Sequence, residues 1–370
     1  FTMIKSIYIH IPFCKNICSY CDFCKNYYNK DIIDKYLDAL NNEILDLYKN
    51  EEIKTVYIGG GTPSSLSLKE LDKLFSIISK INLSKVYEFT FECNYDDITE
   101  ELLKKLKLNK INRLSIGIES FNEKFSKLLN RKINKKEMID KINLSKKYFD
   151  NISIDLMYGM PGQTLEDLNN DIDTFLKLDI AHVSLYSLIL EEHTKLYLKV
   201  KEEVDEDVQS SMYNLIVNKL SNKYKRYEIS NFSKEKYESK HNLTYWNNLP
   251  YYGFGAGASG FIKNVRYTNT KSVFKYINER KVCEKEVLNK EDLMKDEVML
   301  NLRKTSGINK NVFKKKHEVE LDKVFNYKNL IKMNLINETE KNVFIIPDKF
   351  FVSNEIIIMF LDSYIKNNWF

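Results

Sequence analysis

Six short apolar runs rich in β-branched residues, each followed by a turn and an amphipathic helical stretch, fill the chain between residues 5 and 190. Runs this continuously apolar are typical of strands that are covered on both faces, as in a parallel sheet. Successive strand–helix units imply right-handed crossovers and a wound or barrel-like sheet. The sequence therefore predicts an α/β fold, with strands at residues 6–11, 55–60, 88–93, 113–118, 152–159 and 182–190.

The stretches between these strands have helical periodicity, and two of them, at Ser67 and Thr99, are expected to begin with a capping box. After residue 200 the repeat stops, and a helix, a strand and a glycine-rich stretch follow. The end of the chain predicts helices, a β-hairpin and a last apolar helix, an order typical of a winged-helix-like module. The expected helices are 31–49, 67–80, 99–107, 135–148, 164–178 and 203–222, the later strand is 226–232, the glycine-rich stretch is 251–261 and the hairpin is 336–351. We predict three units, at residues 3–200, 201–285 and 286–370.

Charge and hydropathy limit the location and the partners of the protein. The chain has 57 basic and 52 acidic residues, and this mild imbalance predicts no nucleic-acid partner. We find no apolar run of eighteen residues and no signal peptide, so we expect a cytoplasmic protein. Cysteines in that compartment are reduced and are available for metal binding.

Four of the six cysteines lie between residues 14 and 24, where a disulfide knot, a structural zinc and an iron–sulfur cluster are competing explanations. The expected location disfavours disulfides, and zinc sites usually need a second pair of ligands far along the chain. Cys14, Cys18 and Cys21 have the spacing C-x3-C-x2-C. Three thiolates on a four-iron cubane leave one iron open, as a catalytic cluster needs.

The remaining cysteines are interpreted separately. Cys24 could be the fourth ligand of a closed electron-transfer cluster, but we favour a bystander role. Cys93 and Cys283 lie in apolar surroundings, so we expect both to be buried, inert thiols.

Polar or flexible segments follow the expected strands, at the edge where parallel sheets place their chemistry. The cysteine loop follows the first strand and Gly59-Gly60-Gly61-Thr62-Pro63 follows the second. Glycines let a backbone approach a ligand closely, although a triple glycine alone could be a tight turn. Glu92, Glu119 and Asp155 stand in or at the ends of later strands.

These motifs together resemble the radical S-adenosylmethionine superfamily, and within it the family of oxygen-independent coproporphyrinogen III oxidase and its relative, the HemW-type heme chaperone. The resemblance runs from about residue 5 to 265 and more loosely to the end. It rests on "YIHIPFCKNICSYCDF", "YIGGGTPSSL", "FECN", "RLSIGIESFN", "LLNR" and "IDLMYGMPGQT". It implies a partial (β/α)6 TIM-like radical SAM barrel with a smaller α+β C-terminal domain.

The resemblance also implies the roles of individual residues. Cys14, Cys18 and Cys21 would hold a [4Fe–4S] cluster. The residues implied to bind S-adenosylmethionine are Tyr8, Tyr20, Gly60, Gly61, Thr62, Glu92, Glu119, Arg131 and Asp155. At position 119 the family usually has Gln, which can donate and accept a hydrogen bond, whereas ionised Glu only accepts. The role of Glu119 is therefore open.

Two features favour the chaperone branch over the oxidase. Only thirteen residues precede Cys14, whereas the oxidase has a longer segment there, and "HNLTYW" (241–246) matches a motif of the chaperone branch. An imidazole can ligate heme iron, and aromatic rings can stack on a porphyrin. The motif predicts heme contacts from His241, Tyr245 and Trp246.

We therefore expect a heme chaperone that carries heme as cargo, with a [4Fe–4S] cluster and S-adenosylmethionine, and we assign no catalytic residue. Expected partners are acceptor hemoproteins, with membrane respiratory enzymes as candidates that would bring the protein to the membrane periphery. The chain would act as a monomer or homodimer. The alternatives are the oxidase, which decarboxylates coproporphyrinogen III to protoporphyrinogen IX, and a radical enzyme that modifies tRNA or protein.

Overall fold

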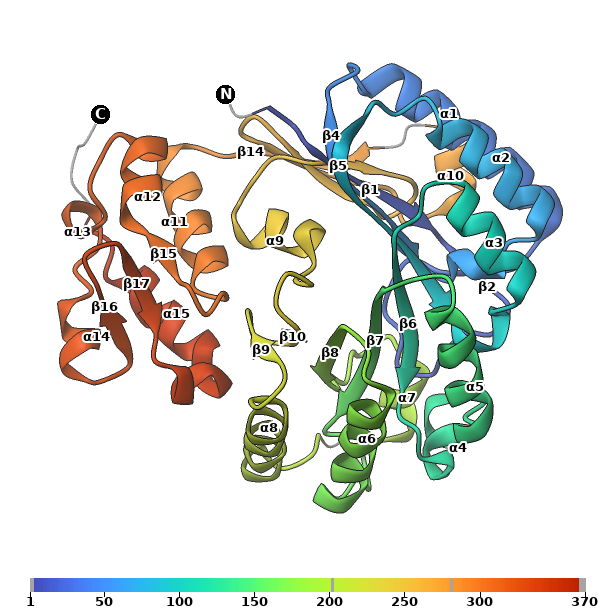
Figure 1. Cartoon of the computed structure of the whole chain (residues 1–370). Coiled ribbons are helices and arrows are strands. Elements are labelled where there is room, and N and C mark those ends of the chain that lie inside the picture. The colour runs from blue at the N-terminus through green and yellow to red at the C-terminus, as the bar shows by residue number, and fades with distance from the viewer. Residues whose placement is uncertain (1–2, 201–202, 280–281, 366–370) are drawn as a thin grey trace.

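The structure is a computed structural model that describes residues 3–200, 203–279 and 282–365. Its largest feature is a curved sheet of nine strands in the order β11-β1-β4-β5-β6-β7-β8-β10-β9 (Figure 1). Six of these strands pair in parallel and in chain order, as predicted. They are β1 (Ser6–Ile11), β4 (Ile53–Gly60), β5 (Leu83–Asn94), β6 (Arg113–Glu119), β7 (Asn151–Tyr158) and β8 (His182–Ser187).

Helices cover the outer face of this sheet, and each predicted helix between the strands is confirmed (Figure 1). They are α1 (Lys30–Leu47), α2 (Leu68–Ile78), α3 (Glu100–Leu108), α5 (Lys135–Lys146) and α6 (Leu165–Leu178). Ser67 and Glu70 form the predicted capping box of α2. Thr99 caps α3 with its side chain alone, because the third position after it is Leu102, which has no carboxylate to return a bond. The predicted partial (β/α)6 barrel is therefore confirmed.

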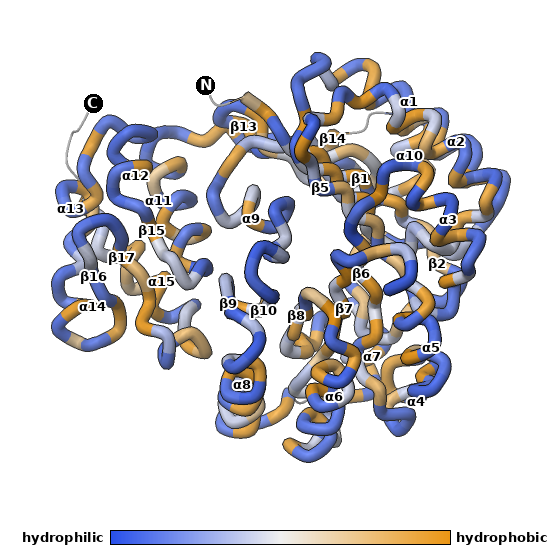
Figure 2. Tube along the Cα trace, viewed as in Figure 1, coloured by the Kyte–Doolittle hydropathy of each residue, from blue (hydrophilic) through white to orange (hydrophobic). Residues whose placement is uncertain are grey.

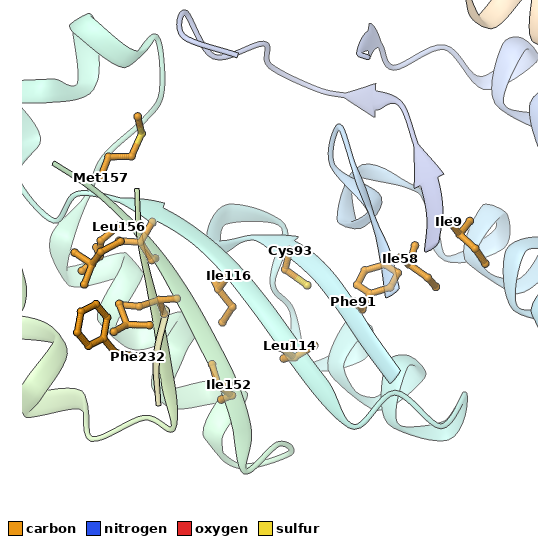
Figure 3. Packing of buried hydrophobic residues seen from close by; sticks show 14 of the residues in the cluster. Ile9, Ile58, Phe91, Cys93, Leu114, Ile116, Ile152, Leu156, Met157 and Phe232 are labelled. Carbon is orange, nitrogen blue, oxygen red and sulfur yellow. The ribbon is translucent and has the colours of Figure 1, made fainter. Parts of the chain in front are cut away.

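Side chains alternate across the sheet, because successive residues of a strand point to opposite faces. Ile58, Phe91, Leu114 and Ile152 lie in the buried hydrophobic core (Figure 3). Their neighbours along each strand, most of them polar or aromatic, point to the opposite, inner face of the curved sheet. The strands are thus held by apolar packing on one face, and the other face is left for chemistry.

The segment after residue 203 extends the sheet at both edges. β11 (Tyr252–Phe254) pairs in parallel with β1, and β10 (Asn231–Ser233) pairs antiparallel with β8. The single strand predicted at 226–232 is wrong, because the structure has β9 (Lys225–Arg226) and β10 with a turn between them. Within that turn the Glu228 carboxylate accepts a hydrogen bond from the Ser230 N–H at 3.0 Å, and Glu228 itself forms an isolated antiparallel bridge with Lys304 of the C-terminal part.

The connections in this segment are α7 (Lys195–Lys199), α8 (Glu206–Leu220), α9 (Lys240–Trp246) and α10 (Val273–Asn278). A second sheet contains β12 (Ser259–Ile262), β13 (Val265–Asn269) and β14 (Val282–Val287). Cys283 lies on β14, every residue of which is exposed, so the prediction that Cys283 is buried is wrong. β14 is the edge strand of a small sheet, and neither of its faces is covered. Cys93, on the helix-covered face of β5, is buried as predicted.

The C-terminal part is a smaller α+β unit, in agreement with the predicted fold class (Figure 1). The predicted hairpin is confirmed over its first ten residues as β16 (Ile336–Glu338) and β17 (Asn342–Ile345), but its predicted end at 347–351 is wrong because these residues are helical, and the predicted last helix is confirmed as α15 (Ser353–Asp362). The other elements are α11 (Lys290–Asn301), β15 (Ile308–Asn309), α12 (Lys310–His317), α13 (Leu321–Val324), α14 (Lys328–Lys332) and η4 (Pro347–Val352). The three-unit division stays a prediction, and its first boundary falls at residues 201 and 202, outside the described residues.

Hydrophilic and hydrophobic residues alternate along the helices around the barrel and in the C-terminal unit (Figure 2). Such helices have one apolar side for the core and one polar side for water. Among the described residues, no helix combines the length and the apolar character that crossing a bilayer would require.

Candidate functional site

The cysteine loop lies at the C-terminal end of β1 and is closed by its own small sheet. β2 (Phe13–Cys14) pairs in parallel with β3 (Asn26–Tyr27), so the two ends of the cysteine loop lie side by side. The Tyr28 N–H donates to the Cys14 carbonyl at 2.9 Å, and the Asn26 N–H donates to the Pro12 carbonyl at 2.6 Å. These bonds fix both ends of the segment that carries the three predicted cluster ligands.

Cys14 lies directly against the triple-glycine loop. A Cβ atom on Gly61 would be only 2.9 Å from Cys14 Sγ, so a larger residue cannot stand there. The Thr62 hydroxyl lies 3.4 Å from the same sulfur and donates to it. Burial raises the pKa of the Cys14 thiol to about 11, so a bound metal must displace its proton.

The segment "LLNR" holds the middle of the cysteine loop. The Ser19 N–H donates to the Leu129 carbonyl at 2.9 Å, and Asn130 Nδ2 donates to the Ile17 carbonyl at 2.9 Å. Asn130 ends the short helix α4 (Ser126–Leu129) in the left-handed conformation. This turn places Arg131 Nη1 at 3.9 Å from Cys18 Sγ.

The donor set fits a cubane cluster better than a single ion. In the described part of the chain, no three His, Cys, Asp or Glu side chains come together as the ligands of one metal ion would. In a cubane each thiolate binds a different iron, so the sulfurs need not converge on one point. Among the described residues, the cysteine loop thus lacks the convergent ligands of a structural zinc site.

Cys24 points away from that group of thiols. Its sulfur donates to the Lys271 carbonyl at 3.1 Å, and its own carbonyl lies 2.8 Å from His10 Nε2. A Cβ on Gly257, which has a φ of +74°, would be 2.5 Å from the Cys24 Cβ. The contacts join the loop to the glycine-rich stretch, and they support a packing role for Cys24.

Glu92 lies beneath the triple glycine, on the inner face of β5. Its carboxylate accepts from the Tyr57 hydroxyl at 2.6 Å and from the Gly60 N–H at 3.1 Å. A Cβ on Gly59 would be 2.8 Å from the Glu92 carboxyl carbon, and Gly60 has a φ of +123°. Burial raises the pKa of Glu92 to about 7, above its ordinary value. A buried carboxylate beside a glycine loop suits a ligand ammonium group.

Asp155 lies on the same inner face of the sheet, on β7. The Ser115 hydroxyl lies 3.4 Å from its Oδ2, and burial raises the pKa of Asp155 to about 6. Arg113, only 2% exposed, faces inward from β6, and its Nε has no hydrogen-bond partner among the described residues. The positive charge of Arg113 lowers the pKa of both Glu92 and Asp155 and partly offsets their burial. The site thus has two partly buried carboxylates and one buried cation on the inner face of the sheet.

Glu119 and Arg131 form an ion pair beside the cysteine loop. Arg131 Nε lies 3.0 Å from Glu119 Oε2, and the two side chains are 9% and 11% exposed. Arg131 Nη2 also donates to the Gly117 carbonyl at 2.6 Å. A register shift between Gly117 and Glu119 and a φ of +59° at Glu119 aim this carboxylate at the arginine. The Tyr20 hydroxyl also hydrogen-bonds Glu119 and lowers its pKa, against a larger upward shift from burial.

Tyr8 completes the group on β1. Its hydroxyl lies 2.9 Å from His10 Nδ1, and its ring stacks on the Tyr57 ring with centroids 6.1 Å apart. The structure therefore gathers the residues predicted to bind S-adenosylmethionine at one end of the sheet. They come from β1, the cysteine loop, the glycine loop, β5, β6, the Arg131 turn and β7.

The three residues predicted to contact heme do not form one open surface. His241 is fully buried, and its Nδ1 and Nε2 lie 2.9 and 2.7 Å from the hydroxyls of Thr55 and Tyr245. Burial lowers the pKa of His241 to about 3, so the ring is neutral. Trp246 points elsewhere, with the Arg303 guanidinium carbon 5.8 Å from its ring centroid. Iron ligation by His241 would require that one of its two hydrogen bonds be broken.

Sequence reasoning missed several inward-facing residues. Tyr57, Asn94 and Ser115 contact predicted site residues, and Asn94 Nδ2 lies 3.4 Å from Thr62 Oγ1. Each stands two positions from another inward residue of its strand. The period of two in a strand could have found them, if the inner face of the barrel had been traced from the recognised residues.

Two family models match the chain. The Radical SAM superfamily model matches residues 8–175, and the HemN C-terminal domain model matches residues 288–345. The first match contains the cysteine loop, the glycine loop and the strands that carry Glu92, Glu119 and Asp155.

Curated relatives match almost the whole chain. The heme chaperone HemW of Lactococcus lactis is 38% identical and covers 96% of this chain and 97% of its own. The heme chaperone HemW of Bacillus subtilis is 39% identical and covers 97% of this chain and 99% of its own. Among solved structures, the coproporphyrinogen III oxidase HemN of Escherichia coli, a radical SAM enzyme, superposes with a TM-score of 0.85 at 19% identity, over 96% of this chain and 90% of that one. The last comparison supports the fold alone.

Proposed function

Because the chain belongs to the heme chaperone HemW family of the radical SAM superfamily, we propose that it binds heme and transfers it to heme-free acceptor proteins. The observation that carries this proposal is the match to two HemW chaperones over nearly the full length of all three chains. The proximity of the cysteine loop to the triple-glycine loop supports a cofactor site at this end of the sheet.

The cofactor residues have distinct tasks. Cys14, Cys18 and Cys21 would hold the [4Fe–4S] cluster, and the Thr62 hydroxyl donates toward the Cys14 sulfur. A hydrogen bond to a ligating sulfur tunes the potential of a cluster. When bound, the cluster supplies an open iron that the amino and carboxylate groups of S-adenosylmethionine can chelate.

The chain itself binds and orients S-adenosylmethionine. The Glu92 carboxylate, fixed by Tyr57 and Gly60, can accept hydrogen bonds from the N–H groups of the amine, and Asp155 suits the ribose hydroxyls. The Arg131 guanidinium suits the carboxylate through paired hydrogen bonds. All three side chains are partly buried, so each contact would be stronger than at an exposed position.

The proposal extends to the acceptor proteins, the location and the oligomeric state. We propose hemoproteins as acceptors, membrane respiratory enzymes as candidates among them, and a cytoplasmic protein that meets the membrane only at its periphery. A monomer or a homodimer would suffice. The heme contacts of His241, Tyr245 and Trp246 remain a prediction, and the buried position of His241 makes it the one that most needs testing.

The deciding experiment uses one anaerobically reconstituted preparation for two assays. Heme is titrated into the protein and its transfer to a heme-free acceptor is followed by absorbance. The same preparation is incubated with coproporphyrinogen III, S-adenosylmethionine and reductant. We expect heme binding and transfer without formation of protoporphyrinogen IX.

Robust formation of protoporphyrinogen IX would instead support the oxidase and contradict the chaperone proposal. The acceptor without the chain is the control for spontaneous heme loss to the acceptor. Cys14→Ser protein, which lacks one predicted cluster ligand, shows whether transfer depends on the cluster.

A further inference from the structure

The helix that carries the HNLTYW motif is seated inside the barrel. The Glu88 carboxylate of β5 accepts from the backbone N–H groups of Lys240 and His241 at 3.0 and 2.9 Å. Thr244 of α9 lies 2.9 Å from the Ser6 hydroxyl of β1. The motif is therefore anchored to inner faces of strands by both its backbone and its side chains.

His241 connects α9 to a third strand, β4. Its ring bonds to Thr55 of β4 and packs on the Tyr57 ring, with centroids 5.2 Å apart and an angle of 33° between the planes. Tyr245 bonds to the other ring nitrogen and meets the imidazole edge-on, 5.0 Å between centroids. With both nitrogens occupied, the His241 ring has one fixed orientation, and it presents a flat surface to Tyr57.

Tyr57 connects this surface to the cofactor site. Its ring packs against the rings of both His241 and Tyr8, and its hydroxyl donates to Glu92 at 2.6 Å. The second oxygen of Glu92 accepts from the Gly60 N–H. An uninterrupted series of contacts thus runs from α9 through Tyr57 to the carboxylate beside the glycine loop.

We propose that Tyr57 is a positioning residue for S-adenosylmethionine and that the HNLTYW helix, through His241, holds Tyr57 in place. This inference rests on the proposed function, because it takes Glu92 as a contact of S-adenosylmethionine. It gives the motif a task at the cofactor site that does not require His241 to ligate heme iron. Loss of the Tyr57 hydroxyl would leave the Glu92 carboxylate with one fewer donor and a wider range of orientations.

The electrostatic surroundings of Glu92 give the proposal a specific signature. Burial raises the pKa of Glu92, and the hydrogen bond from Tyr57 lowers it. The other groups that face Glu92 are Asp155 of β7, Arg113 of β6, Tyr8 of β1, Tyr186 of β8 and Tyr245 of α9. None of these changes in Tyr57→Phe protein. The variant should therefore have a Glu92 of higher pKa, and the acidic limb of S-adenosylmethionine binding should move to higher pH.

The first test measures the affinity of the anaerobically reconstituted protein for S-adenosylmethionine between pH 5.5 and 8.5, a range of about 1.5 units around the pKa of Glu92. We expect Tyr57→Phe to weaken binding at pH 7 by roughly tenfold, the usual effect of one hydrogen bond to a charged group, and to shift the acidic limb upward. Tyr252→Phe is the matched control, since its hydroxyl donates to Glu51 at 2.9 Å, outside the cofactor site. If the fall of S-adenosylmethionine affinity at acidic pH occurs at the same pH in Tyr57→Phe as in the wild type, the proposal is overturned, with or without a loss of affinity at pH 7.

The second test separates this role from heme ligation. His241→Ala should weaken S-adenosylmethionine binding, and heme titration of the same variant reports independently on the proposed function. His182→Ala is the control, because His182 is also buried with bonds from both ring nitrogens, to Ser153 at 2.7 Å and Tyr227 at 2.8 Å. If His241→Ala does not fold, Tyr245→Phe replaces it, since that change removes one hydroxyl from the same network. S-adenosylmethionine affinity equal to that of the control would overturn the role of α9, whatever the heme result.

Discussion

At the scale of single residues, position 119 shows how one substitution alters a binding site. The family usually has Gln there, and this chain has a Glu that pairs with Arg131 at 3.0 Å. Arg131 is the residue predicted to receive the carboxylate of S-adenosylmethionine. Glu119 therefore neutralises the charge that the ligand would use, and the two carboxylates compete for one guanidinium.

We expect Glu119→Gln to bind S-adenosylmethionine more tightly, by roughly tenfold, because Arg131 is then free for the ligand. The ligand-free variant should lose about 2 kcal/mol of unfolding free energy, since an almost buried arginine has lost its partner. Equilibrium binding and chemical denaturation check the two effects. Weaker binding in Glu119→Gln would show that Glu119 contacts the ligand itself.

The buried Glu92 predicts a pH dependence of stability in the protein without cluster or ligand. Its pKa is raised to about 7, so between the ordinary Glu pKa and pH 7 the folded state binds more protons than the unfolded state. Stability then falls as pH rises through this window, by up to about 3 kcal/mol. Glu92→Gln removes this titration.

The melting temperature of Glu92→Gln should therefore exceed that of the wild type by an amount that grows between pH 5 and pH 8. Thermal unfolding of both proteins across that range, on cluster-free samples, measures the difference. A difference that stays constant with pH would contradict the raised pKa.

At the scale of elements, the cysteine loop is held in place by hydrogen bonds at its ends and in its middle. Its ends are fixed by β2 and β3, and its middle by the turn before Arg131. Cys24 adds a contact to the glycine-rich stretch through the Lys271 carbonyl. A fourth cysteine in the loop is thus accounted for by packing.

We expect Cys24→Ser to retain about four iron and four sulfide per chain, because a serine hydroxyl can donate to the same carbonyl. Replacement of Cys14, Cys18 or Cys21 by Ser should abolish the cluster. Iron and sulfide analysis after anaerobic reconstitution distinguishes the variants. Cluster loss in Cys24→Ser would mean that Cys24 is a ligand.

The elements also show what the sequence could and could not predict. The six strands that pair in chain order were predictable, because each carries a plain apolar run, whereas β11, which pairs in parallel with β1, was expected only as part of a glycine-rich stretch. The strand at 226–232 was not predictable, because a turn closed by the Ser230 N–H on the Glu228 carboxylate divides it, and Glu228 pairs with Lys304, which is far away in the sequence. Cys283 looked buried from its apolar neighbours, but edge exposure depends on tertiary neighbours that a local pattern does not contain.

The candidate site also contains residues that the sequence could predict and residues that it could not. Cys14, Gly60 and Asp155 carry recognisable motifs, and the structure brings them to one end of the sheet. Tyr57 carries none, because a tyrosine in an apolar strand is also typical of a core. Its contact with Glu92 spans 35 positions, and only the register of β4 against β5 brings the two together.

At the scale of the whole molecule, Arg226 joins the barrel to the C-terminal unit. Its Nη2 donates to the Pro347 carbonyl at 2.8 Å, and its guanidinium lies 4.4 Å from the centre of the Phe350 ring. Tyr213 of α8 receives a second bond from the same side chain at 3.0 Å. One side chain therefore links β9, α8 and η4.

We expect Arg226→Ala to weaken this junction by about 1–2 kcal/mol, through loss of the hydrogen bonds and the cation–π contact. Hydrogen exchange should accelerate in η4 and α15 and remain unchanged in β1 and β4. Lys225→Ala, at the exposed neighbouring position, is the control. Equal exchange in both variants would exclude a coupling role for Arg226.

The two edge strands of the nine-stranded sheet bear on how this chain behaves at high concentration. An open sheet offers unpaired backbone groups at its edges, and long flat edges recruit strands from other molecules. Here β11 has three residues and β9 has two, so each edge offers a foreign strand very few hydrogen bonds. A barrel that stays open for a ligand is thereby protected against edge-to-edge aggregation without the need to close.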